Sequence, residues 1–131
     1  MWESFENYLN KKMKRLLPLP FRYWKSYMMG LIDENGKLLR KPSTANELQI
    51  HNAFTDLVRK FKRTMELYIP SKGVLRHKVY KDFLDDNSII NKIAETMNYS
   101  YELDVINEEQ IAIIENELIW WLNSRGNNVK I

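Results

Sequence analysis

Cysteine is absent from the 131-residue sequence, and histidine occurs only twice, at His51 and His77. Without cysteine the chain can form no disulfide and no thiolate metal site, and it has no cysteine nucleophile. Neither histidine has a partner at the spacing of a short metal-binding motif. These absences exclude disulfide-stapled and thiolate-zinc proteins, and they fit a protein of a reducing compartment.

Glycine and proline are also sparse, with four of each, and long hydrophobic runs are missing. The few glycines form no nucleotide-binding loop, and the composition excludes low-complexity and collagen-like chains. No apolar stretch reaches the roughly 18 residues of a membrane-spanning helix. The first residues lack the basic start and apolar middle of a signal peptide. We therefore expect no membrane partner.

Apolar residues are abundant enough for a packed core. Hydrophobic residues make up 44% of the chain and aromatic residues 12%, which excludes wholesale disorder. A domain of this length buries roughly two thirds of the surface that its unfolded chain exposes. We expect residues 1–131 to form a single domain.

Charge is distributed unevenly along the chain, although the net charge is only +3. Residues 1–81 contain 17 Lys and Arg against 7 Asp and Glu, a net charge of +10. Residues 82–131 contain 3 against 10, a net charge of −7. The basic part is expected to attract a polyanion, either nucleic acid or an acidic protein. The acidic part is expected to shield it, to pair with it in a second copy, or to face another basic partner.

Apolar side chains recur at helical spacing in most of the sequence, so we predict an all-α domain of five or six helices. Thr44 and Glu47 match a capping box, which predicts that one long helix begins there and continues to about residue 68. Residues 107–110 match a second cap, and Asn87 or Ser88 is the expected cap of another helix. The predicted helical segments are residues 3–17, 21–29, 44–68, 72–86, 88–98 and 107–122, with 21–29 expected to be short and buried.

One small β-hairpin is predicted around Asn35 and Gly36, which lie between residues 31–34 and 37–40. An Asn-Gly pair flanked by apolar and polar residues is a strong signal for a tight hairpin turn. Residues 99–105 alternate enough to predict a short extended segment as well.

No constellation indicates catalysis, so we expect a protein that is not an enzyme and that holds neither a cofactor nor a metal. His51 falls beside the apolar stripe of its predicted helix and is expected to be a surface or boundary residue. Asp82, Asp85 and Asp86 share a helix face, and a site for a hard cation is one interpretation of this cluster. Acids at this helix junction are better explained by the positive end of the following helix.

Basic clusters are the strongest candidates for function, because phosphate contact needs only cations along a face. Nearby aromatic residues such as Tyr23 and Phe61 are expected to belong to the core. The candidate residues for binding a polyanion or an acidic partner are Lys11, Lys12, Lys14, Arg15, Arg40, Lys41, Arg59, Lys60, Lys62 and Arg63.

Trp120 is a candidate interface residue. Trp121 belongs to the apolar stripe of the last helix, and Trp120 lies about 100° from it around the helix axis. A tryptophan outside the core stripe is typical of an interface anchor, because large aromatic residues dominate binding hot spots. A wider buried stripe is the alternative.

Residues 27–42 and the following capped helix, which ends in residues 57–63, resemble small proteins of contractile-tailed bacteriophages. The similarity covers roughly residues 20–65 and carries no catalytic residue. It implies a virion or accessory protein that acts in phage assembly or in a nucleoprotein, in the bacterial host cytoplasm or in the virion.

Three hypotheses for function follow from these patterns. The first is a non-enzymatic virion, assembly or accessory protein that docks on an acidic partner through its basic N-terminal two thirds and self-associates through its acidic helix. The second is a nucleic-acid-binding protein without sequence readout. The third is a regulatory binder of a host or viral enzyme.

Overall fold

The structure, a computed structural model, describes residues 5–68, 74–96 and 106–125. This part of the chain is predominantly helical and contains no strand, so the all-α prediction is confirmed. It has seven α-helices, one or two more than predicted, because the segment predicted over 44–68 is divided into α3 and α4. The elements are α1 (Phe5–Leu16), η1 (Phe21–Tyr23), α2 (Lys25–Met28), α3 (Ala45–Ile50), α4 (Ala53–Tyr68), α5 (Val74–Asp85), α6 (Asn87–Thr96) and α7 (Glu108–Arg125).

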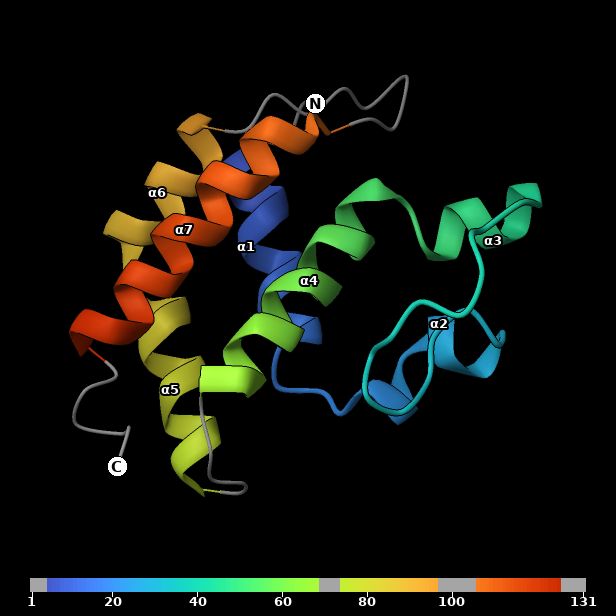
Figure 1. Cartoon of the computed structure of the whole chain (residues 1–131), viewed down its shortest axis with the longest axis horizontal. Helices are drawn as coiled ribbons and strands as arrows, with labels where there is room; N and C mark the ends of the chain where they lie inside the picture. The colour runs from blue at the N-terminus through green and yellow to red at the C-terminus, as the bar shows by residue number, and fades with distance from the viewer. Residues whose placement is uncertain (1–4, 69–73, 97–105, 126–131) are drawn as a thin grey trace.

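Helix α4 lies at the centre of the described fold. Helices α1 and α7 both pack against it, and α6 packs against α1 and α7, so these elements form a bundle with α5 (Figure 1). The short helices α2 and α3 contact each other on the side of α4 that faces away from α5, α6 and α7. An irregular segment joins them (Figure 1). No helix in the described ranges is long and apolar enough to cross a membrane.

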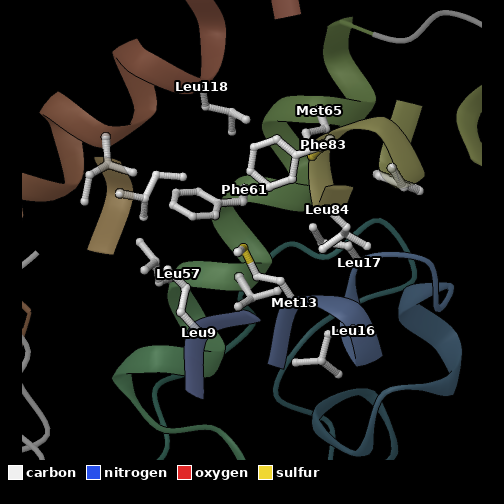
Figure 2. Packing of buried hydrophobic residues seen from close by; sticks show 14 of the residues in the cluster. Leu9, Met13, Leu16, Leu17, Leu57, Phe61, Met65, Phe83, Leu84 and Leu118 are labelled. Atoms are coloured by element: carbon white, nitrogen blue, oxygen red, sulfur yellow. The ribbon is translucent and has the colours of Figure 1, made fainter. Parts of the chain in front are cut away.

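The core forms where α1, α4, α5 and α7 meet. Figure 2 shows Met13, Phe61 and Phe83 converging from three of these helices, with Leu118 of α7 closing the cluster. Phe83 also meets the ring of Trp121 edge to face, with centroids 5.3 Å apart. Each buried side chain of this size stabilises the fold by about 1.5–3 kcal/mol, so this cluster is a main source of stability. The predicted core positions of Phe61 and Trp121 are confirmed.

The long helix predicted over residues 44–68 is interrupted at His51 and Asn52. Its capping box is present, because the Thr44 hydroxyl accepts from the amide of Glu47 at 3.1 Å and the Glu47 carboxylate accepts from the amide of Thr44. Helix α3 then ends, and the Asn52 side chain accepts from the amide of Thr55 at 2.8 Å. This second cap starts α4, so the prediction of one continuous helix is wrong.

The predicted β-hairpin is absent from the described residues, where a single antiparallel bridge joins Ile32 and Leu38. The Asp33 carboxylate accepts from the amides of Asn35 and Lys37, each at 2.9 Å, and thereby forms a wider turn than a two-residue hairpin. These local bonds satisfy amides that a ladder would otherwise use. The position of the turn is therefore confirmed, but the prediction of a β-hairpin is wrong.

Two further predictions concern helix starts. Helix α6 is capped by Asp86 rather than by Asn87 or Ser88, because its carboxylate accepts from the amide of Ser88 at 3.1 Å. The other oxygen of Asp86 accepts from the indole of Trp121 at 2.9 Å, which ties the start of α6 to α7. Asn107 caps α7 by accepting from the amide of Glu109 at 2.8 Å, as predicted. The extended segment predicted over 99–105 lies outside the described residues.

Candidate functional site: a basic cleft

The predicted cations do not form one surface. Lys41 and Lys60 line a hollow beside the start of α7, Arg63 lines a second hollow, and Lys12 and Arg15 line a third. The cations that reach the surface at least in part are Lys11, Lys12, Lys14, Arg15, Arg40, Lys41, Lys60 and Arg63. The predicted binding residues therefore lie on several separate parts of the surface rather than on one interface.

Arg59 and Lys62 are buried, with only 6% and 2% of their surface exposed. Arg59 donates to the Asp56 carboxylate at 2.7 Å and to the carbonyl of Gly36 at 3.0 Å. Lys62 donates to the carbonyl of Leu17 at 2.7 Å. Their charges are used inside the fold, so including them in a polyanion-binding surface is wrong.

Arg40 is half-exposed, but its guanidinium group is also engaged. Its two terminal nitrogens donate to the two carboxylate oxygens of Glu47, at 3.0 and 2.5 Å, and one also donates to the carbonyl of Met29. The bonds from Arg40 and from the Ser43 amide lower the pKa of Glu47 to about 2. Arg40 thus fastens the segment after α2 to the start of α3.

The third hollow, the basic cleft, is lined by Lys12, Arg15 and Lys25 and lies between α1, the η1–α2 segment, α3 and α4. It has a volume of about 390 Å³, at the small end of the range for ligand pockets. Lys12 and Arg15 line the cleft from α1. They are three residues apart and therefore lie on the same face of this helix. Lys25, the first residue of α2, adds a third cation. The other lining residues are Leu16, Leu19, Tyr23, Trp24, Ser26, Gln49, Ile50 and Thr55.

The turn after α1 places residues of α1 and α2 around the same hollow. Pro18 and Pro20 prevent α1 from continuing, because proline lacks an amide donor and restricts the residue before it. The indole of Trp24 then donates to the carbonyl of Leu19 at 3.0 Å and packs against the ring of Phe21, with centroids 5.0 Å apart. These contacts hold the wall of the basic cleft in place.

Three positive charges gather in the basic cleft. In the part of the chain that the structure describes, no carboxylate forms an ion pair with Lys12, Arg15 or Lys25. Partial burial of Lys12, together with the charges of Arg15 and Lys25, lowers the pKa of its ammonium group. Like charges gathered in this way favour a bound anion.

Tyr23 stands at the rim of the basic cleft and is 53% exposed, so its predicted place in the core is wrong. The guanidinium carbon of Arg22 lies 5.1 Å from the centre of its ring. This cation–π contact restrains the tyrosine ring while leaving much of it open to solvent.

Thr55 lies on the α4 side of the basic cleft and is only 3% exposed. Its hydroxyl oxygen is buried and has no hydrogen-bond partner among the described residues. A buried polar group without a partner costs about 1–3 kcal/mol, so this hydroxyl is a candidate donor to a ligand.

A buried hydrogen-bonded chain begins at Ser26, which lines the basic cleft. The hydroxyl of Ser26 lies 2.7 Å from Nδ1 of His51, and Nε2 of His51 lies 2.8 Å from the Asp56 carboxylate. A carboxylate only accepts, so Nε2 of His51 carries the hydrogen of the bond to Asp56. Although burial acts to raise it, the bonds from His51 and Arg59 hold the pKa of Asp56 well below its ordinary value.

His51 is therefore buried, and its predicted position at the surface or boundary is wrong. The order of serine, histidine and aspartate is that of a hydrolase relay. We assign it a structural role, because Ser26 and His51 are buried and Asp56 is shared with Arg59. The chain connects α2 to α4: Ser26 lines the basic cleft, whereas His51 and Asp56 line the hollow beside the start of α7. In the described ranges, no three His, Asp or Glu side chains gather to hold a metal ion.

Trp120 lies on the outer face of α7 and is 64% exposed, so its predicted position outside the core is confirmed. Ile113, which is seven residues earlier and therefore on the same face, is exposed too. Between them lies Glu117, whose carboxylate pairs with Lys92 of α6 at 3.1 Å.

The sequence pointed to part of the basic cleft through the run of cations in α1 and the aromatic segment around Trp24. Thr55 and Gln49 carried no such signal, because they belong to other helices and join the cleft only through folding. No family model, curated protein or solved structure matches the chain.

Proposed function

We propose that this protein is a non-enzymatic binding protein that docks on single-stranded nucleic acid, without sequence readout, through the basic cleft and the exposed face of α1. The observation that carries the proposal is the group of Lys12, Arg15 and Lys25, with which no carboxylate of the described residues forms an ion pair. Lys11 and Lys14 extend the positive charge along α1. Cations placed in this way release the counterions condensed on a phosphate backbone when they bind it.

The exposed ring of Tyr23 favours nucleic acid over an acidic protein. Bases stack on aromatic side chains with little dependence on sequence, and such stacking contributes about 1–3 kcal/mol per base. The carboxylates of an acidic protein would pair with the cations but would not stack on the ring of Tyr23. The resemblance of residues 20–65 to small phage proteins supports a role in virion assembly or in a nucleoprotein.

Charge reversal in the basic cleft tests this proposal. Arg15→Glu combined with Lys25→Glu is expected to weaken binding to a labelled single-stranded oligonucleotide at least about tenfold, by a similar factor for different sequences. Fluorescence anisotropy at several salt concentrations measures the effect. The slope of log K against log salt should fall in magnitude by about 1–2, because two phosphate contacts are lost.

Lys78→Glu combined with Lys81→Glu is the matched control, because these exposed α5 lysines change the net charge equally but lie outside the basic cleft. We expect this control to weaken binding less than about threefold. Equal losses in both variants would contradict the cleft as the binding site. Absence of oligonucleotide binding at low salt would leave an acidic protein as the partner.

Trp120 gives a separate prediction about self-association. We propose that the exposed face of α7 binds a second copy of the chain, because Trp120 and Ile113 leave apolar surface uncovered on this face and the net negative charge of α7 complements a basic surface of the neighbour. Trp120→Ala is expected to change the free energy of unfolding by less than about 0.5 kcal/mol. The same change should weaken self-association at least about tenfold, since buried tryptophans are frequent hot spots.

Sedimentation velocity over a range of concentrations measures this effect. Leu67→Ala is the control, because Leu67 is also a large exposed apolar residue but lies on α4. A parent protein that stays monomeric at high concentration would contradict the interface. Unfolding of the Trp120 variant would instead assign Trp120 to the core.

A further inference from the structure

The basic cleft concentrates more positive charge than one internal phosphate of a strand neutralises. Lys12, Arg15 and Lys25 line the same hollow of about 390 Å³. An internal phosphodiester carries one negative charge, whereas a terminal phosphomonoester carries about 1.5–2 at pH 7 because its second pKa is about 6. A terminal phosphate therefore matches these three cations better than an internal one.

The lining of the basic cleft also suits a ligand that ends there. Walls come from α1, the η1–α2 segment, α3 and α4, so residues from four elements surround the hollow. An internal phosphate is linked to sugars on two sides, and both links need an exit. A terminal phosphate needs only one, and the strand can then leave past the exposed ring of Tyr23.

Neutral donors in the basic cleft match the oxygens of a phosphomonoester. The Thr55 hydroxyl is buried without a partner among the described residues, and Gln49 adds a side-chain amide at the edge of α3. A phosphomonoester presents three strong acceptor oxygens. A bond from Thr55 to such an oxygen would remove the cost of its unpartnered hydroxyl.

We propose that the basic cleft binds the phosphorylated end of a nucleic-acid strand, with its terminal phosphomonoester held between Lys12, Arg15 and Lys25. This inference rests on the proposed function and narrows it from strands in general to strand ends. The same phosphomonoester occurs in a free nucleoside monophosphate, so the experiment separates the two sources.

The test compares the affinity of the full chain for one short single-stranded oligonucleotide with a 5′-phosphate, a 3′-phosphate or hydroxyls at both ends. We expect a terminal phosphate at one of the two ends to tighten binding about tenfold or more, which corresponds to about 1.4 kcal/mol. Free nucleoside monophosphate and inorganic phosphate are added as competitors. Both should compete weakly, because they lack the remaining contacts of the strand.

Lys12→Met is expected to remove most of the preference for a phosphorylated end, because methionine keeps an apolar stem in the half-buried position but carries no charge. Lys14→Met is its control, since Lys14 is exposed on α1 and does not line the basic cleft. It should weaken binding to all ends equally and keep the preference.

Thr55→Val is a second, independent variant, because valine matches the shape of threonine without its hydroxyl. We expect it to reduce the preference for a phosphorylated end about threefold to fivefold and to leave the midpoint of thermal unfolding unchanged or higher. A lower midpoint would show that the hydroxyl is satisfied within the fold and would overturn its role as a donor.

Three outcomes separate this inference from the proposed function. If oligonucleotides with phosphate ends and with hydroxyl ends bind with equal affinity, the inference about strand ends is overturned. The proposed function then still stands, because the oligonucleotides bind. Free nucleoside monophosphate competing as well as the phosphorylated oligonucleotide would assign the basic cleft to free nucleotides and overturn the role of strand ends. Absence of any oligonucleotide binding at low salt would overturn both.

Discussion

Replacing Lys62 by methionine is expected to lower the free energy of unfolding by about 2–4 kcal/mol. The substitution removes the hydrogen bonds of a buried ammonium group and leaves its acceptors without a donor. The ammonium group donates to the carbonyl of Leu17 at 2.7 Å and to the hydroxyl of Tyr80 at 3.2 Å, and it pairs with Glu66 at 3.1 Å. It also lies 5.2 Å from the ring centre of Phe21. Methionine fills a similar space but leaves the carbonyl of Leu17 without this donor.

Urea unfolding followed by circular dichroism measures the loss. Lys60→Met is the matched control, because Lys60 is half-exposed on the same helix and lies 4.0 Å from Asp56 in a weak ion pair. We expect the control to change stability by less than about 0.5–1 kcal/mol. Equal effects of the two substitutions would mean that the buried contacts of Lys62 make no net contribution to stability.

Gly36→Ala is expected to destabilise the fold by about 3 kcal/mol or more, since steric overlap and an unfavourable backbone conformation act together. Gly36 has a φ of +79°, which side chains rarely adopt. A Cβ atom at this position would also lie 2.4–2.7 Å from three carbons of the Phe21 ring. Phe21 packs against Trp24, so its displacement should disturb the basic cleft as well.

Gly30→Ala separates the two causes. Gly30 has a similar φ of +75°, but a Cβ atom there would meet nothing within 4 Å. The Gly30→Ala substitution should therefore lower the free energy of unfolding by only about 1–2 kcal/mol, because only the backbone conformation is unfavourable. Thermal and urea unfolding of both variants give the difference, which measures the overlap with Phe21. Equal costs would show that the Phe21 ring moves aside freely.

Helix α4 illustrates how far the sequence alone predicts the core. The spacing of Phe54, Leu57, Phe61 and Met65 correctly marks its buried face. The same spacing leaves Lys62 and Arg59 in the polar part of the helix, because periodicity records residue types and not the neighbours that cover them. Segments from elsewhere in the chain, including Leu17 and Tyr80, supply the partners that bury these cations.

Local sequence patterns alone predict the helical class, the position of most helices and the caps at Thr44 and Asn107. These features depend on neighbours within a few residues, and so their signals lie in short segments of the chain. Three features do not follow from local patterns: His51 is buried, Tyr23 is exposed and Thr55 joins the basic cleft. Each of these depends on residues far away in the sequence, which become neighbours only when the helices pack.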